Sequence, residues 1–126
     1  MTINLPAPDS WVWKDPEVWV GVDLDGTLAD SRGPRGNETI GPPIPAMVEL
    51  VRTLIAAGIE VRIMTARVSI DQDLQAQRHV KDWCRKHIGF ELLVTCRKDY
   101  GMLALIDDRA YHVEENSGVL EGVIKW

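Results

Sequence analysis

The chain has 126 residues, of which 45% are hydrophobic and 26% are charged, and its formal net charge at pH 7 is −5. This length accommodates one domain and excludes a multidomain enzyme, and the composition excludes a disordered chain, which would contain far fewer apolar residues. No apolar run approaches the roughly 20 residues of a membrane span, and residues 1–9 lack the basic start and apolar core of a signal peptide, so we expect a cytoplasmic globular protein without a membrane partner.

The charge is unevenly distributed along the chain. Residues 62–98 contain eight Lys or Arg and four Asp or Glu, a net charge of +4, so the rest of the chain carries −9. A net negative charge is unusual for proteins that bind nucleic acid, but this basic segment leaves that class open. Cys84 and Cys96 are too few for a disulfide framework and match no zinc pattern, so we expect reduced thiols.

The first third of the chain predicts one strand between two irregular segments. Residues 1–17 form a Pro-rich N-terminal lead-in, whose Trp11 and Trp13 we expect to pack on the core. Residues 18–23 are apolar on both faces, which is typical of a central parallel strand covered by helices. Residues 29–43 are rich in Gly and Pro and therefore predict a loop.

Helices and strands alternate along the rest of the chain. Apolar residues recur at helical spacing from Pro45 to Gly58, and again over a helix that opens at Ser69, in a capping box with Gln72, and ends at Gly89. Short apolar runs predict further strands over residues 59–65, 92–95, 102–106 and 119–124. This alternation predicts a single α/β domain over residues 1–126, with a parallel sheet of about five strands and right-handed crossovers.

Acidic and polar residues stand at the ends of these predicted strands. They are Asp23 and Asp25 after the first strand, Thr65, Ala66 and Arg67 after the second, Lys98 before the fourth, and Asp107 and Asp108 after the fourth. Ligands of open α/β sheets bind outside the carboxyl ends of the strands, so we expect these residues to share one site. In an extended chain Asp23 and Asp25 would project to the same side, about 7 Å apart.

The chemistry of these residues suits a phosphoryl group. Four converging carboxylates repel one another, and a hard divalent ion, Mg²⁺ above all, would relieve that repulsion. Gly26 allows backbone amides to point into the site, while Thr65 offers a hydroxyl group and Lys98 a compact positive charge. An attacking carboxylate, a carboxylate that moves protons, Mg²⁺ and a lysine are the parts that phosphoryl transfer requires.

Four motifs, in this order, resemble those of the haloacid dehalogenase (HAD) superfamily of phosphohydrolases. Residues 20–28, Val-Gly-Val-Asp-Leu-Asp-Gly-Thr-Leu, resemble its first motif, Ile63-Met64-Thr65 its second, Lys98 its third, and Leu105-Ile106-Asp107-Asp108 its fourth. The resemblance covers roughly residues 18–113. It implies a Rossmann-like three-layer sandwich.

The resemblance also implies a role for each matching residue. Asp23 would be the nucleophile that forms an aspartyl-phosphate, and Asp25 the general acid and then the general base. Mg²⁺ would be held by Asp107 and Asp108, with the Asp23 side chain and the Asp25 carbonyl. The phosphate or the rest of the substrate would be bound by Thr65, Ala66, Arg67 and Lys98. In having Asp25, the chain resembles the phosphatase branch of the superfamily and not the dehalogenases, which do not need this second acid.

Two departures leave the substrate open. Only 17 residues separate Leu28 from Ala46, so we expect no cap domain, and by resemblance a capless site admits a bulky substrate or a partner subunit, including a second copy of the chain. Thr65-Ala66-Arg67 and Asp107-Asp108-Arg109 are also distantly similar to the phosphatase domain of phage polynucleotide kinase. That likeness implies processing of a nucleic-acid 3′-phosphate, as an alternative to a small phosphorylated molecule.

Simpler interpretations of the same residues also stay open. Arg67 and Arg109 could form ion pairs with nearby acids instead of binding substrate, and Arg32 and Arg35 could belong to a solvated loop. The whole chain could also be a non-catalytic module that binds a metal or a phosphate.

Overall fold

The computed structural model describes residues 5, 7, 17–33, 36, 39–70 and 74–122. Its elements in chain order are β1 (Trp19–Val22), α1 (Pro45–Ala56), β2 (Val61–Met64), the 3-10 helix η2 (Ala66–Val68), α2 (Gln75–His87), β3 (Val94–Thr95), β4 (Met102–Ile106), β5 (His112–Val113) and β6 (Leu120–Glu121). The fourth predicted strand matches β4 residue for residue. None of the helices in the described ranges is both long enough and apolar enough to cross a membrane.

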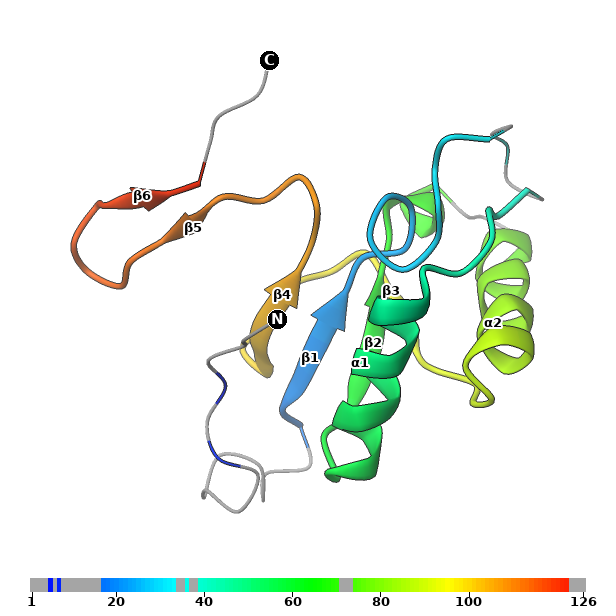
Figure 1. Cartoon of the computed structure of the whole chain (residues 1–126), viewed down its shortest axis with the longest axis horizontal. Helices are drawn as coiled ribbons and strands as arrows, with labels where there is room; N and C mark the ends of the chain where they lie inside the picture. The colour runs from blue at the N-terminus through cyan, green and yellow to red at the C-terminus, as the bar shows by residue number, and fades with distance from the viewer. Residues whose placement is uncertain are drawn as a thin grey trace.

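Four strands form one parallel sheet in the order β3-β2-β1-β4. The chain moves from β1 to β2 to β3 on one side and then returns to place β4 on the other side of β1 (Figure 1). The point where the strand order reverses therefore lies between β1 and β4, where open α/β sheets bind their ligands. Val22 pairs with Ile106, so the residues that follow these two strands are neighbours.

The hydrophobic core lies between the sheet and both α-helices. Val20 and Val22 of β1 and Ile63 of β2 have no exposed surface, and they belong to the same buried cluster as the apolar faces of α1 and α2. The residues that the helices contribute to this cluster are Met47, Val48, Val51, Leu54, Val80, Trp83 and Cys84. The two helices therefore cover the same face of the sheet, as two consecutive right-handed crossovers require.

The opposite face of the sheet carries Trp19, which is fully buried outside that cluster. The Arg62 guanidinium carbon lies 4.7 Å from the centre of a Trp19 ring, and the indole N–H donates a hydrogen bond of 2.9 Å to Asp99. The α/β class with a parallel sheet is confirmed, whereas a helical layer on this second face, which a three-layer sandwich requires, is not among the described elements.

The last predicted strand does not join the parallel sheet. Leu120–Glu121 forms β6, which pairs antiparallel with β5 in a separate hairpin, with Val113 opposite Leu120 (Figure 1). Asn116 and Gly118 adopt positive φ angles of 62° and 73° in the connecting turn, which reverses the chain directly. The parallel sheet therefore has four strands instead of about five.

The predicted capping box at Ser69 is also wrong. The Ser69 hydroxyl donates a hydrogen bond of 2.7 Å to the Ala66 carbonyl and closes η2, and α2 begins only at Gln75. Leu74 has a left-handed φ of 64°, so it separates α2 from the preceding turn. Gln72 lies outside the described residues, as do Trp11, Trp13 and Arg35.

Candidate active site

Three carboxylates converge at the carboxyl ends of β1 and β4. Asp23, Asp107 and Asp108 each offer an oxygen within 4.8 Å of the other two, and we call these three residues the acidic cluster. The Asp23 backbone N–H donates a hydrogen bond of 2.9 Å to the Ile106 carbonyl, which extends the pairing of β1 with β4 by one residue. Parallel pairing at the strand-order reversal thus brings together residues from the first and fourth predicted motifs.

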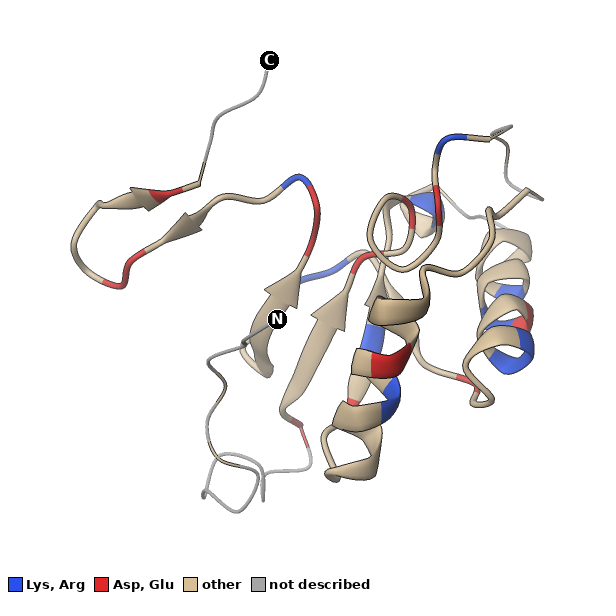
Figure 2. Cartoon of the chain, viewed as in Figure 1, with Lys and Arg blue, Asp and Glu red and all other residues tan. Residues whose placement is uncertain are grey.

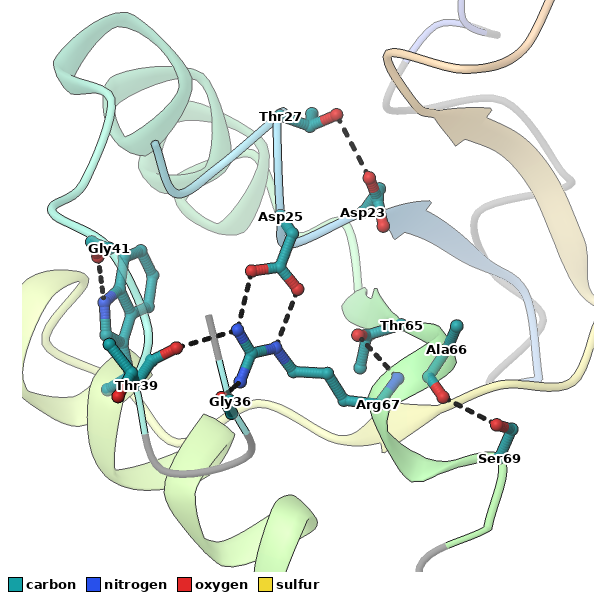
Figure 3. Close-up of polar contacts among 11 residues, drawn as sticks. Asp23, Asp25, Thr27, Gly36, Thr39, Gly41, Thr65, Ala66, Arg67 and Ser69 are labelled. Atoms are coloured by element: carbon teal, nitrogen blue, oxygen red, sulfur yellow. Dashed lines mark hydrogen bonds and ion pairs between the residues drawn. The ribbon is translucent and has the colours of Figure 1, made fainter. Parts of the chain in front are cut away.

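Thr27 holds this cluster together, although the sequence analysis did not single it out. Its hydroxyl donates a 2.9 Å hydrogen bond to Asp108 Oδ1 and accepts one of 2.9 Å from the Asp108 backbone N–H. The same hydroxyl lies 3.4 Å from Asp23 Oδ2 (Figure 3). The Thr27 side chain is buried, so few other partners could satisfy this hydroxyl. The signal available in the sequence was the position of Thr27 in the run Asp-Leu-Asp-Gly-Thr.

Gly26 lets the turn approach Asp108 closely. Its φ is +88°, and a Cβ atom at this position would lie 2.6 Å from an Asp108 carboxylate oxygen. Any other residue would therefore be strained by its backbone conformation and would also displace Asp108.

The acidic cluster has the properties of a site for a hard divalent cation. Burial, a hydrogen bond with Asp108 and the negative charge of Asp107 raise the pKa of the Asp23 carboxyl group to about 7. Crowded carboxylate oxygens are the donors that Mg²⁺ and Ca²⁺ prefer, and a bound cation would compensate their mutual repulsion. The donor set therefore fits the predicted Mg²⁺.

Asp25 has a cationic partner of its own. Arg67 Nε lies 2.7 Å from Asp25 Oδ2, and Arg67 Nη2 lies 2.8 Å from Asp25 Oδ1, which makes the ion pair bidentate (Figure 3). Arg67 also donates hydrogen bonds of 2.8 Å to the Gly36 carbonyl and 2.9 Å to the Thr39 carbonyl. Arg67 was expected either to bind substrate or to form an ion pair with a nearby acid, and the structure contains the ion pair.

Thr65 follows β2 and is almost fully buried. Its backbone N–H donates a hydrogen bond of 2.9 Å to the Thr95 carbonyl, and its hydroxyl oxygen accepts one of 3.2 Å from the Arg67 backbone N–H. The hydroxyl hydrogen thus remains available for a ligand. The same hydrogen bond starts η2 and turns Arg67 toward Asp25.

A cavity of about 620 Å³ connects these groups. Of the predicted site residues, those that line it are Asp23, Asp25, Thr65, Ala66, Arg67 and Asp107. Asp108 is exposed and does not line the cavity, although it belongs to the acidic cluster. A cavity of this size accommodates a small organic ligand.

The basic residues are arranged differently from the sequence prediction. Lys98 is exposed in the connection after β3 and does not line the cavity, whereas Arg109 does. The Arg109 backbone N–H donates a 2.7 Å hydrogen bond to Asp107, and its side chain forms no ion pair within the described part of the chain. Arg32 pairs with Asp30, and its hydrogen bonds lower the pKa of that carboxyl group to about 2.

Comparison with known proteins supports the fold more than the chemistry. No family model and no curated protein matches the chain. The chain is similar to a solved structure of a conserved protein from Bacteroides thetaiotaomicron, with 25% sequence identity and a TM-score of 0.51, over 72% of this chain and 75% of that one. This similarity to a conserved protein brings no activity with it, so the function of this chain has to be inferred from the site itself.

Proposed function

We propose that the chain is a Mg²⁺-dependent phosphomonoester hydrolase of the HAD type, which acts through an aspartyl-phosphate on Asp23. The observation that carries this proposal is the convergence of the acidic cluster with Asp25 and Thr65 around one cavity. These residues come from three separate strand ends, and their chemistry matches the parts that phosphoryl transfer requires.

In this proposal Asp23, Asp107 and Asp108 hold the metal ion, together with the Asp25 carbonyl. The ion supplies positive charge that offsets the charges of these carboxylates and of the substrate phosphate. Thr27 and Gly26 keep Asp108 against the cluster, so they position a metal ligand without contacting the substrate.

Asp23 and Asp25 carry out the two chemical steps. In the first, an Asp23 carboxylate oxygen bonds to phosphorus, the ester P–O bond breaks, and Asp25 gives a proton to the leaving oxygen. In the second, the Asp25 carboxylate takes a proton from water, the water oxygen bonds to phosphorus, and the bond between Asp23 and phosphorus breaks. Inorganic phosphate leaves, and the bidentate ion pair with Arg67 orients the Asp25 carboxyl group for both steps.

The phosphate group is proposed to meet the Thr65 hydroxyl, the Ala66 backbone amide and the positive charge of Arg109, all of which line the cavity. Lys98, which does not line the cavity, is not part of this proposed set. The proposed compartment is the cytoplasm, because both Cys84 and Cys96 are free thiols.

The test is phosphate release from an aryl phosphate, nucleoside monophosphates and sugar phosphates, with Mg²⁺ and with chelator. Asp23→Asn should abolish release, while Asp82→Asn, which neutralises an exposed acid on α2, should keep it. Release that survives chelation or Asp23→Asn would overturn the proposal. Tight phosphate binding without any turnover would instead support a non-catalytic binding module.

A nucleic-acid 3′-phosphate is the second candidate substrate, because Lys and Arg residues gather on α2 (Figure 2). Lys81 and Arg85 pair with Asp82 or Glu91, so less of this charge is available than the sequence suggests. Adding a 3′-phosphorylated oligonucleotide to the panel tests this candidate. A steep salt dependence with the oligonucleotide would favour it, and equal rates on a bare nucleotide would exclude it.

A further inference from the structure

Arg67 connects three parts of the site that are far apart in the sequence. It lies in η2 after β2, binds the Asp25 carboxylate after β1, and binds two carbonyls of the loop over residues 29–43 (Figure 3). Its side chain is only 14% exposed, although arginine is normally one of the most exposed residue types.

The donors of this guanidinium are largely occupied. Arginine has five N–H donors in a fixed planar fork. Nε and one Nη2 hydrogen bind Asp25, the other Nη2 hydrogen binds the Thr39 carbonyl, and Nη1 binds the Gly36 carbonyl. A phosphate oxygen that approached any of these four donors would have to displace its partner and leave a partly buried carboxylate or a carbonyl without that donor.

The two ends of the loop are joined by other contacts. Its base is closed by backbone pairing of Ala29 with Pro43 and by a hydrogen bond of 2.8 Å from the Asp30 N–H to the Pro42 carbonyl. Trp83 of α2 donates a 3.0 Å hydrogen bond to the Gly41 carbonyl, near the same end.

Farther along the loop, the Arg67 side chain contacts the Gly36 and Thr39 carbonyls. Both residues line the cavity, as does Asp25. The guanidinium therefore sets the distance between this wall of the cavity and the Asp25 carboxylate.

We infer that Arg67 is a positioning residue, which orients Asp25 and fixes the loop against it, and is not a ligand of the substrate phosphate. Because this role rests on the proposed hydrolase activity of Asp23 and Asp25, its loss should reduce the rate of the chemical steps more than substrate binding. Arg109 lines the same cavity without an ion-pair partner among the described residues. Its replacement by alanine is therefore the matched control, because it also removes one positive charge from the cavity.

The experiment compares the full-length wild type with Arg67→Ala, Arg67→Lys and Arg109→Ala. Steady-state kinetics on an aryl phosphate are combined with hydrogen exchange, measured by mass spectrometry, of peptides that cover residues 29–43. Arg67→Ala should lower kcat about 100-fold with KM within about threefold, because a misplaced catalytic group costs this much without altering binding. It should also speed exchange in the loop about tenfold.

Arg67→Lys keeps the charge but cannot form the planar fork, so it should lose most of the same kcat and loosen the loop as well. Arg109→Ala should raise KM and leave loop exchange at the wild-type rate. If Arg67→Ala does not fold, as judged by circular dichroism, Arg67→Lys carries the test.

Arg67 variants that raise KM about tenfold, keep kcat and leave loop exchange unchanged would overturn the positioning role and make Arg67 a substrate ligand. A wild type without phosphatase activity would overturn the proposed function alone. In that case the exchange data would still decide the structural link, since unchanged loop exchange in both Arg67 variants would refute it.

Discussion

The four aspartates of the site fall into two groups that differ in how their negative charge is compensated. The negative charge of Asp25 is compensated by the bidentate ion pair with Arg67 of the same chain. In the acidic cluster, Asp23, Asp107 and Asp108 face one another, and the pKa of Asp23 is raised to about 7. One carboxylate thus has a built-in cation and a fixed orientation, while the other three suit a cation from solution.

Under the proposed function, this contrast corresponds to two separate roles around one cavity. A carboxylate that moves protons must lie within hydrogen-bond reach of the reacting atoms, so a fixed orientation favours this role. Carboxylates that bind a metal ion need neighbours close enough to repel one another until the ion arrives. Each of the following substitutions acts mainly on one of the two groups, so their effects should be separable.

After the loss of the proposed nucleophile Asp23, the largest expected effect comes from Asp25→Asn, which removes the proposed proton-transfer group and weakens its ion pair with Arg67. We expect kcat to fall about 10³-fold, within the range that general acid–base catalysis supplies. Mg²⁺ binding measured by calorimetry should stay within about threefold of wild type, because the acidic cluster is intact. Asp82→Asn is the control for a generic loss of negative charge.

Asp108→Asn acts on the other group. It removes one anionic ligand from the acidic cluster while retaining a side chain that can bond to Thr27. We expect Mg²⁺ affinity to fall at least about tenfold, as disruption of metal sites commonly does. Activity should recover at high Mg²⁺ concentration, whereas that of Asp25→Asn should not. Unchanged affinity would mean that Asp108 does not bind the ion.

The pH dependence of stability should expose the uncompensated charge of Asp23. The folded pKa of about 7 exceeds the ordinary value of 3.8, so the folded state binds more protons between these two pH values. Stability from this group is therefore present below pH 4 and is lost as pH rises through 7. We expect a loss of about 1–2 kcal/mol, since solvent screens a half-buried carboxylate.

Chemical denaturation of wild type and Asp23→Asn in chelator, from pH 4 to pH 8, measures this effect. The difference in the free energy of unfolding should favour Asp23→Asn increasingly as pH rises, and Mg²⁺ should reduce it by stabilising wild type. A difference that does not vary with pH would show that Asp23 titrates normally in the folded protein.

Thr27→Val should change stability by about as much as the ionisation of Asp23. Valine matches the shape of threonine but removes the hydroxyl group, which leaves the Asp108 backbone N–H and carboxylate without this partner. We expect a loss of about 1–2 kcal/mol in the free energy of unfolding and a modest loss of Mg²⁺ affinity. Thr27→Ser retains the hydroxyl and should stay close to wild type in both measurements.

Much of the fold was predictable because it depends on local pattern. The continuous apolar runs over residues 18–23 and 102–106 identified β1 and β4, which lie side by side in the parallel sheet. Gly58 correctly marked the end of α1, since it follows the last helical turn with a φ of +84°. The prediction failed at Ser69, where a hydrogen bond to Ala66 closes a 3-10 turn instead of opening a helix.

The sequence by itself determined which residue types stand at the strand ends, and therefore that carboxylates would gather at one edge of a parallel sheet. Only the tertiary structure decided which carboxylate meets which partner. Arg67 is 42 positions from Asp25, and Thr27 is 81 positions from Asp108. Such pairs form only after β2 and β4 have paired with β1 on its two sides, and no one-dimensional pattern contains that register.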